Sequence, residues 1–250
     1  MPPREGPPPV PIEGLYRLLR ERFGHQGWWP AETPLEVCVG AILVQNTAWT
    51  GAERAISRLK RAGALRSARA LHAVPVSALE QWIRPAGIFR VKAHRLRQFL
   101  DHLLTRHGGS VDDALRGPPG VVRERLLSIP GIGPETADCM LLYAGGQSRF
   151  VVDAYARRIF RRHGWMDTGM NDDVLRLRCE SAAARLNLRN PVDFWQDLHA
   201  QLVAVGKVHC RSRLADCTDC PLRPLLPLGG HPIVDERPPK RIKRSGGRTR

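Results

Sequence analysis

Apolar side chains recur every three or four residues along most of the chain, which is the spacing of a helix with one buried face. One such helix is predicted to begin near Ile12, with an apolar face made of Leu15, Leu18, Leu19 and Phe23. Residues 34–44 are apolar nearly all round and predict a helix inside the core. Eight further helices are predicted at 50–63, 76–84, 90–106, 119–128, 135–144, 153–163, 171–186 and 192–208. The run 149–152 resembles a strand but is too short to build a sheet, so the pattern predicts an all-α protein.

The two ends of the chain do not follow this pattern. Residues 1–11 contain six prolines and are expected to be irregular. From Gly229 onward the sequence consists mainly of proline, glycine and basic residues, which predicts a flexible segment. Two interpretations of this segment remain: a solvated end of the chain, or an arm that contacts DNA.

Composition and charge narrow the class of partner. The chain has 250 residues, of which 42% are hydrophobic, enough for one large or two small domains with real cores. Its 39 Lys and Arg against 24 Asp and Glu give a net charge of +15, which favours a polyanion: nucleic acid first, an anionic membrane second. A merely basic surface is the alternative. Only five of the cations are lysines, so few amines are available as nucleophiles.

Neither a membrane span nor a signal segment is evident. No run reaches the roughly 20 apolar residues that cross a bilayer, and the N-terminus lacks an apolar signal core. We therefore expect a cytoplasmic protein, associated with the nucleoid if the source is bacterial. Six cysteines in such a protein favour free thiols or a metal site over disulfides, and Cys210, Cys217 and Cys220 are clustered.

Two glycines separate two predicted helices in the middle of the chain. Residues 121–129 and 135–144 form the helices, and Pro134 suits the first turn of the second one. Gly131 and Gly133 lack Cβ atoms, so their amides and the free N–H groups of the second helix can approach an anion. This hairpin predicts a phosphate site that does not read sequence; an ordinary packing corner between helices is the alternative.

Three motifs, in this order, resemble the helix-hairpin-helix DNA glycosylases of the endonuclease III superfamily. Residues 127–133, Leu-Ser-Ile-Pro-Gly-Ile-Gly, resemble the family's hairpin, and Phe-Val-Val-Asp at 150–153 resembles its loop and catalytic aspartate. Cys210, Cys217 and Cys220, with six and two intervening residues, resemble the start of its iron–sulfur loop. The resemblance covers about residues 12–222 and is closest to the 3-methyladenine glycosylase branch.

The resemblance implies two helical domains with a DNA-binding cleft between them. The six-helix domain would comprise residues 31–146, with the helix-hairpin-helix motif at about 119–144. The iron–sulfur-loop domain would join residues 12–30 to 147–222, and residues 223–250 would form a basic extension. The implied partner is double-stranded DNA with a damaged base, bound by a monomer.

Asp153 and Glu135 decide the expected chemistry. Taken alone, an aspartate at a helix start is usually an N-cap. With the hairpin 20 residues upstream, the resemblance implies that Asp153 orients or deprotonates a water and offsets the positive charge that develops on the sugar. Glu135 occupies the position where bifunctional relatives carry the lysine that forms a Schiff base. A carboxyl cannot form that imine, so we expect base removal with AP-lyase activity weak or absent.

The damaged base must leave the helix, and a side chain must fill the gap. Gln45 resembles the family's gap-filling glutamine, and Ile88 resembles its wedge in the opposite strand, although an ordinary loop position fits Ile88 equally well. Arg90 and Lys92, beside Ile88, are predicted phosphate contacts. The DNA-binding set is thus predicted as Gly131, Ile132, Gly133, Gln45, Ile88, Arg90 and Lys92.

Four residues are predicted to form the base pocket: Trp28, Trp29, Pro30 and Trp49. Aromatic rings suit a base that already carries positive charge, such as an N-alkylated purine, through stacking and cation–π attraction. Simple core packing is the alternative for these rings. Oxidised pyrimidines removed with AP-lyase activity are the second substrate hypothesis, and a weakly active or inactive damaged-DNA-binding protein is the third.

The metal site departs from the family pattern, because Leu226 stands where the fourth cysteine belongs. We expect a 4Fe–4S cluster with a structural role, held by the three thiolates and by His231, Asp235 or water. A zinc ion held with His209 or His231, or a loop that has lost its metal, are the alternatives.

Overall fold

The computed structural model describes residues 6–227 and 229–233, and in this part of the chain every regular element is a helix or a helical turn, with no strand. The all-α prediction is therefore confirmed. The α-helices are α1 Ile12–Phe23, α2 Pro34–Leu43, α3 Trp49–Arg61, α4 Ala68–His72, α5 Val76–Ile83, α6 Phe89–His107, α7 Val111–Ala114, α8 Pro119–Leu127, α9 Pro134–Cys139, α10 Ala154–Arg162, α11 Asp172–Ala183 and α12 Pro191–Val208. Short turns complete them: η1 Ala64–Arg66, η2 Arg84–Ala86, the π-helical η3 Met140–Ala144 and η4 Arg223–Leu225.

Helix α2 lies at the centre of the core, as its apolar sequence predicts. The Thr33 hydroxyl accepts a hydrogen bond from the Glu36 amide, and Pro34 starts the first turn. Every residue from Leu35 to Leu43 is buried. The helix packs against α3, α6, α9 and η3, so the second half of the hairpin is anchored on it.

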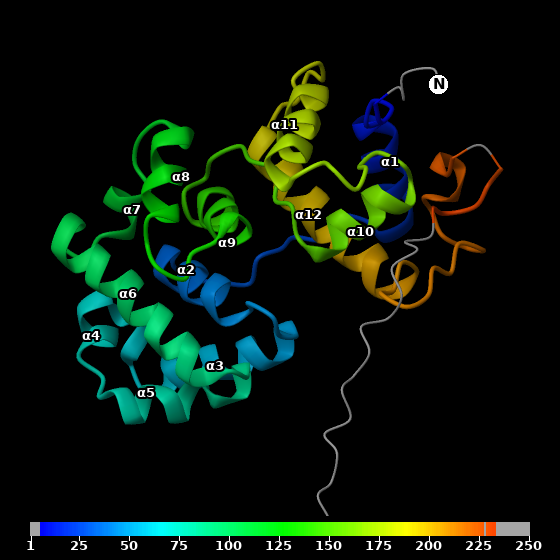
Figure 1. The fold of residues 1–250 in the computed structure, drawn as a ribbon. Helices are drawn as coiled ribbons and strands as arrows, with labels where there is room; N and C mark the ends of the chain where they lie inside the picture. The colour runs from blue at the N-terminus through cyan, green and yellow to red at the C-terminus, as the bar shows by residue number, and fades with distance from the viewer. Residues whose placement is uncertain (1–5, 228, 234–250) are drawn as a thin grey trace, which may run out of the picture.

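The helices gather in two groups (Figure 1). Helices α2 to α9 lie on one side of the molecule, and α1 lies on the other side with α10, α11 and α12. Helix α1 packs on α11 and α12, and α12 also contacts η3, which joins the two groups. The chain passes between the groups at residues 24–33 and 145–153. The domain boundaries given above stay predictions.

Some local features differ from the sequence-based prediction. Helices α4 and α7, of five and four residues, are too short for an apolar period to reveal, although Ser67 and Ser110 cap them. The second hairpin helix continues as a π-helical turn, and residues 149–152 are extended without pairing as a strand. Residues 234–250, which include Asp235 and most of the basic extension, lie outside the described residues.

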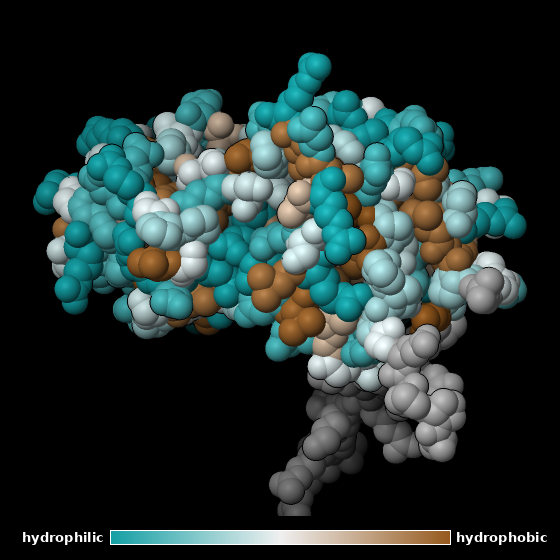
Figure 2. Space-filling view, turned by 90° about the horizontal axis from the view of Figure 1, so that it is seen from above, coloured by the Kyte–Doolittle hydropathy of each residue, from teal (hydrophilic) through white to brown (hydrophobic). Residues whose placement is uncertain are grey.

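The surface is polar over much of its area. In Figure 2, hydrophilic side chains cover most of the half formed by α4–α8, and apolar residues show in patches on the other half. Among the described residues, no helix combines the length and apolarity that a membrane crossing needs.

Candidate functional site

The hairpin between α8 and α9 has the open backbone that the sequence predicts. Gly131 has a φ of +91°, a left-handed value that favours glycine, and a Cβ there would run into the Arg95 side chain. At Gly133 a Cβ would meet nothing within 4 Å, so this glycine leaves space for a ligand. Ile132 is buried and its amide donates to the Ile129 carbonyl at 3.0 Å. In the described part of the chain, the amides of Gly131 and Gly133 donate to no protein acceptor and can bind an anion.

Gln45 lies against this hairpin. Its Nε2 donates to the Gly131 carbonyl at 3.1 Å and to the Thr136 hydroxyl at 2.8 Å. Its Oε1 accepts from Arg95 Nη1 at 2.5 Å. Arg95 is a residue that sequence reasoning missed; it fills the space that Gly131 leaves and brings a cation to the hairpin.

Ile88 is exposed and strained at the start of α6. Its side chain is 61% exposed, and its φ of +43° places a β-branched residue in the left-handed region. Such strain is tolerated mainly at functional positions, and the wedge role of Ile88 stays a prediction. Arg90, on the first turn of α6, is exposed and lies over the Phe89 ring.

The phosphate contact predicted for Lys92 is wrong. The side chain is 1% exposed, and its Nζ donates to the carbonyls of Leu43 at 2.9 Å and Ala86 at 2.5 Å. Burial lowers the pKa of this ammonium to about 8. Lys92 therefore holds the η2 segment against α2 from inside the core.

Asp153 is buried immediately before α10 and is its N-cap. Its Oδ1 accepts from the Ala156 amide at 2.7 Å, which fixes the carboxylate at the helix N-terminus. Its Oδ2 lies 3.6 Å from Nε2 of His199, a buried residue of α12. The structural role as a cap and the predicted catalytic role thus use different oxygens.

Glu135 lies in the first turn of α9, near Asp153. Desolvation raises the pKa of its carboxyl, and the Asp153 charge raises it further. The two carboxyls thus lie close enough to influence each other, and the role of Glu135 at the position of the lyase lysine stays a prediction. Of the three lysines in the described residues, Lys60 pairs with Glu32 and Glu36, Lys92 is buried, and Lys207 is exposed on α12.

The consecutive Trp28 and Trp29 come together with Trp49, from the start of α3, beside this site. Trp28 and Trp29 are stacked with ring centroids 5.4 Å apart, and Trp49 packs edge-on against Trp29 at 5.0 Å. Tyr143, which the sequence did not single out, lies 5.1 Å from the Trp29 ring. Pro30 is exposed at the edge of this group.

The aromatic group connects to Asp153 through one imidazole. The Trp28 and His199 rings are 5.5 Å apart, and His199 Nδ1 lies 2.8 Å from the Tyr143 hydroxyl. Trp28, Trp29 and Tyr143 also line a pocket of about 260 Å³, whose other lining residues are polar, such as Asp193 and Asp197, and apolar, such as Val37. The aromatic rings, on which a planar base can stack, and the Asp153 carboxylate therefore lie on either side of His199.

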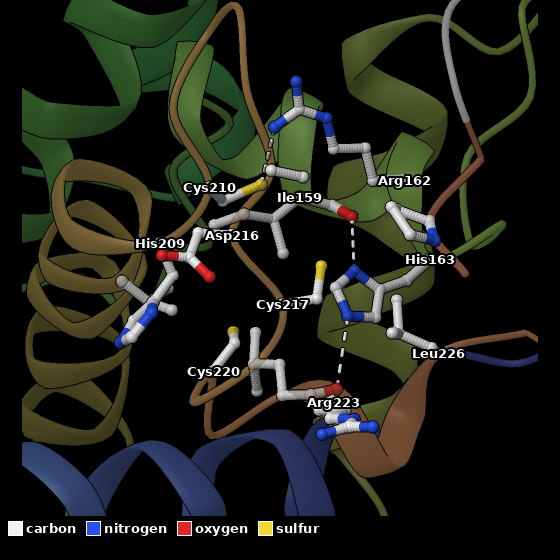
Figure 3. Close-up of a pocket in the computed structure, with 14 residues that line it drawn as sticks. Ile159, Arg162, His163, His209, Cys210, Asp216, Cys217, Cys220, Arg223 and Leu226 are labelled. Atoms are coloured by element: carbon white, nitrogen blue, oxygen red, sulfur yellow. Dashed lines mark hydrogen bonds between the residues drawn. The ribbon is translucent and has the colours of Figure 1, made fainter. Parts of the chain in front are cut away.

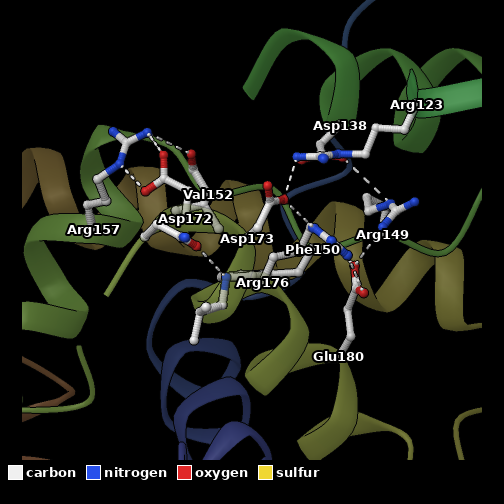
Figure 4. A network of polar contacts seen from close by, with 12 residues as sticks. Arg123, Asp138, Arg149, Phe150, Val152, Arg157, Asp172, Asp173, Arg176 and Glu180 are labelled. Carbon is white, nitrogen blue, oxygen red and sulfur yellow. Dashed lines mark hydrogen bonds and ion pairs between the residues drawn. The ribbon is translucent and has the colours of Figure 1, made fainter. Parts of the chain in front are cut away.

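A network of arginines and carboxylates holds the hairpin against α11 (Figure 4). Arg123 of α8 contacts Asp138 at 2.8 Å and Asp173 at 2.7 Å. Glu180 accepts from the Phe150 amide at 3.1 Å and from Arg176 at 2.8 Å. The segment that leads to Asp153 is thereby fixed between the hairpin and α11.

The three clustered cysteines line one cavity (Figure 3). Cys210 is buried, Cys217 and Cys220 are half-buried, and the Leu226 side chain lines the same cavity. The Arg162 guanidinium donates to Cys210 Sγ at 3.2 Å. Burial raises the pKa of the Cys217 thiol and raises that of Cys220 to about 11, and the neighbouring thiols add to both shifts.

The possible further ligands differ in position. The His209 imidazole lines the cavity, and its Nε2 is buried without a hydrogen-bond partner. His163 also lines it, but both of its ring nitrogens face carbonyl oxygens, whereas His231 is exposed. Within residues 6–227 and 229–233, no three His, Cys, Asp or Glu side chains converge on a single metal position. Thiols and imidazoles are the ligand types of soft metals and iron–sulfur clusters, so the residue types that line the cavity suit such a group although these described side chains do not converge on one position.

Comparison with known proteins places this arrangement in a family. Solved structures show the fold: the Helicobacter pylori 3-methyladenine DNA glycosylase MagIII bound to 1,N6-ethenoadenine is 24% identical, with a TM-score of 0.66 over 78% of this chain and 95% of that one. A non-covalent endonuclease III–DNA complex is 23% identical, with a TM-score of 0.68 over 86% of this chain and 93% of that one.

Sequence relatives extend over nearly the whole chain. A Methanocaldococcus jannaschii protein that carries the name of a DNA repair glycosylase is 39% identical over 213 residues, 85% of this chain and 94% of the relative. Endonuclease III of Thermotoga maritima is 28% identical over 85% of this chain and 90% of its own length. Residues 39–184, more than half of the chain, match the model of the HhH-GPD superfamily base excision DNA repair protein. The chain therefore belongs to the HhH-GPD superfamily of base excision DNA repair proteins.

Proposed function

We propose that this DNA glycosylase is monofunctional and removes N-alkylated purines from double-stranded DNA, acting as a monomer. The observation that carries the proposal is the position of Asp153, one imidazole ring away from the Trp28 ring. An aromatic group beside a carboxylate suits a cationic base, because both interact favourably with positive charge.

Asp153 supplies the chemistry in this proposal. A water oxygen bonds to C1′ of the sugar while the N-glycosidic bond breaks and its electron pair leaves with the base. The free carboxylate oxygen of Asp153 orients this water, accepts its proton and offsets the charge that develops on the sugar. A base that is already cationic is a good leaving group, so no strong general acid is required.

Glu135 supports the absence of a lyase step. It occupies the site where an amine would attack the sugar, and Lys60 and Lys92 are engaged elsewhere. The test offers the protein duplexes that contain methylated purines, oxidised pyrimidines or uracil, and adds borohydride in parallel. We expect free base from the methylated duplex and no trapped protein–DNA adduct. Release from oxidised pyrimidines alone, or a borohydride-trapped adduct, contradicts this proposal.

The cysteine cavity belongs to a second proposal, that of a 4Fe–4S cluster held by Cys210, Cys217 and Cys220. Such a cluster supplies structural cross-linking here, since glycosidic hydrolysis transfers no electrons. The unpartnered Nε2 of His209 is the further donor that the cavity offers. We expect iron and acid-labile sulfide in purified protein, and more of both in Leu226→Cys, which restores a fourth thiol. Zinc without iron, or no metal in either protein, contradicts the cluster.

A further inference from the structure

His199 and Tyr143 form a contact chain that ends on the free oxygen of Asp153. The Tyr143 hydroxyl lies 2.8 Å from His199 Nδ1 and 3.1 Å from the Gln196 carbonyl, and its single hydrogen can be donated to only one of these two acceptors. On the other side of the ring, His199 Nε2 lies 3.6 Å from Asp153 Oδ2. His199 is 4% exposed, so water does not compete freely for its nitrogens.

The arrangement of hydrogens in this chain is limited by chemistry. A neutral imidazole carries one N–H, and a bare Nε2 lone pair would face the Asp153 carboxylate with the wrong charge. The repulsion disappears when the phenol donates to Nδ1 and Nε2 carries the hydrogen, or when the ring is protonated on both nitrogens. Both arrangements that avoid the repulsion point an N–H at Oδ2 of Asp153.

We propose that His199 is the positioning residue of this active site, with its Nε2–H directed at Asp153 by the Tyr143 hydroxyl. The proposal rests on the catalytic role proposed for Asp153. The Ala156 amide holds Oδ1 of Asp153. The distance of 3.6 Å from His199 Nε2 to Oδ2 is longer than a hydrogen bond, so His199 orients Oδ2 and leaves it free to accept a hydrogen bond from the water. The Oδ2 atom is thereby held in one orientation, toward the position proposed for the water and the sugar.

The Trp28 ring packs on both aromatic members of this contact chain. It packs against His199 at 5.5 Å and against Tyr143 at 6.3 Å, so a ring of the predicted base pocket contacts both residues that lead to Asp153. The pocket for the base and the catalytic carboxylate are thus connected through His199 and Tyr143.

The test measures recognition of charge at the sugar, independently of which lesion is removed. The two probes are duplexes in which one deoxyribose is replaced by a cationic pyrrolidine or by an uncharged tetrahydrofuran. Wild type is expected to prefer the pyrrolidine. His199→Phe is expected to lose about 3- to 10-fold of that preference, less than a full hydrogen bond to a charged group would give, because the contact is 3.6 Å long. Affinity for the tetrahydrofuran duplex should stay unchanged.

Two variants separate positioning from packing. His199→Gln keeps an N–H donor and is expected to restore most of the preference. Tyr143→Phe should lower it in wild type but have no further effect in His199→Phe, because both act through one contact chain. Tyr16→Phe is the matched control. The Tyr16 hydroxyl donates at 2.8 Å to Asp197, which lies on α12 like His199, and it does not reach Asp153.

The outcomes distinguish the two proposals. If wild type binds both probes equally, the anionic role of Asp153 fails and the role of His199 fails with it. If wild type prefers the pyrrolidine and His199→Phe keeps that preference, only the positioning role is overturned. Equal losses in His199→Phe and Tyr16→Phe also overturn it, because both changes would then act through α12 packing.

Discussion

At the scale of single residues, the carboxyls of Asp153 and Glu135 have different surroundings. Asp153 is held at a helix N-terminus by the Ala156 amide, whereas desolvation and the Asp153 charge raise the pKa of Glu135. A raised pKa means that the folded protein binds the Glu135 proton more tightly than the unfolded chain does. Glu135 therefore costs stability as the pH rises above its ordinary pKa of 4.5.

Glu135→Gln removes this cost. We expect no change in the urea unfolding midpoint at about pH 3, where the carboxyl is almost fully protonated in both states, and a higher midpoint than wild type at about pH 8. Glu53→Gln, at an exposed position on α3, is the matched control and should show no such pH dependence. An equal midpoint difference at both pH values would contradict the raised pKa.

At the scale of one element, the start of α6 combines strain with exposure. Ile88→Asn should relieve the left-handed strain and stabilise the fold by about 1 kcal/mol, since asparagine tolerates this conformation. The same change removes the wedge, so base release from duplex DNA should fall while release from single-stranded DNA persists. Val91→Asn, which removes an exposed apolar side chain from the same helix, is the control. Unchanged release from duplex DNA by Ile88→Asn would argue against the wedge.

The helices were largely predictable because their apolar period is local. The hairpin and Asp153 could be found for the same reason, since each is a short motif with a known chemistry. Tyr143 and His199 could not, because they are 56 residues apart and meet only where α12 packs on η3. For Lys92 a signal existed: it lies four and seven residues before Leu96 and Phe99, on the buried face of α6.

At the scale of the whole molecule, the network in Figure 4 joins the hairpin to α11. Arg123→Met leaves the buried Asp138 carboxylate without its nearest partner and should lower the free energy of unfolding by about 3 kcal/mol. Arg17→Met breaks an exposed pair with Glu21 and should change the free energy of unfolding by less than about 0.5 kcal/mol. Urea unfolding measures both, and similar losses in the two variants would show that the network does not hold the molecule together.

The proposed removal of the base depends on Asp153 as its catalytic carboxylate. Asn is as good an N-cap as Asp, so Asp153→Asn should fold normally and keep its affinity for DNA. The decisive measurement is the single-turnover release of free base from a duplex with methylated purines. We predict that Asp153→Asn releases the base about 10²- to 10⁴-fold more slowly than wild type. Release at the wild-type rate by a folded, DNA-binding Asp153→Asn protein would contradict the central claim.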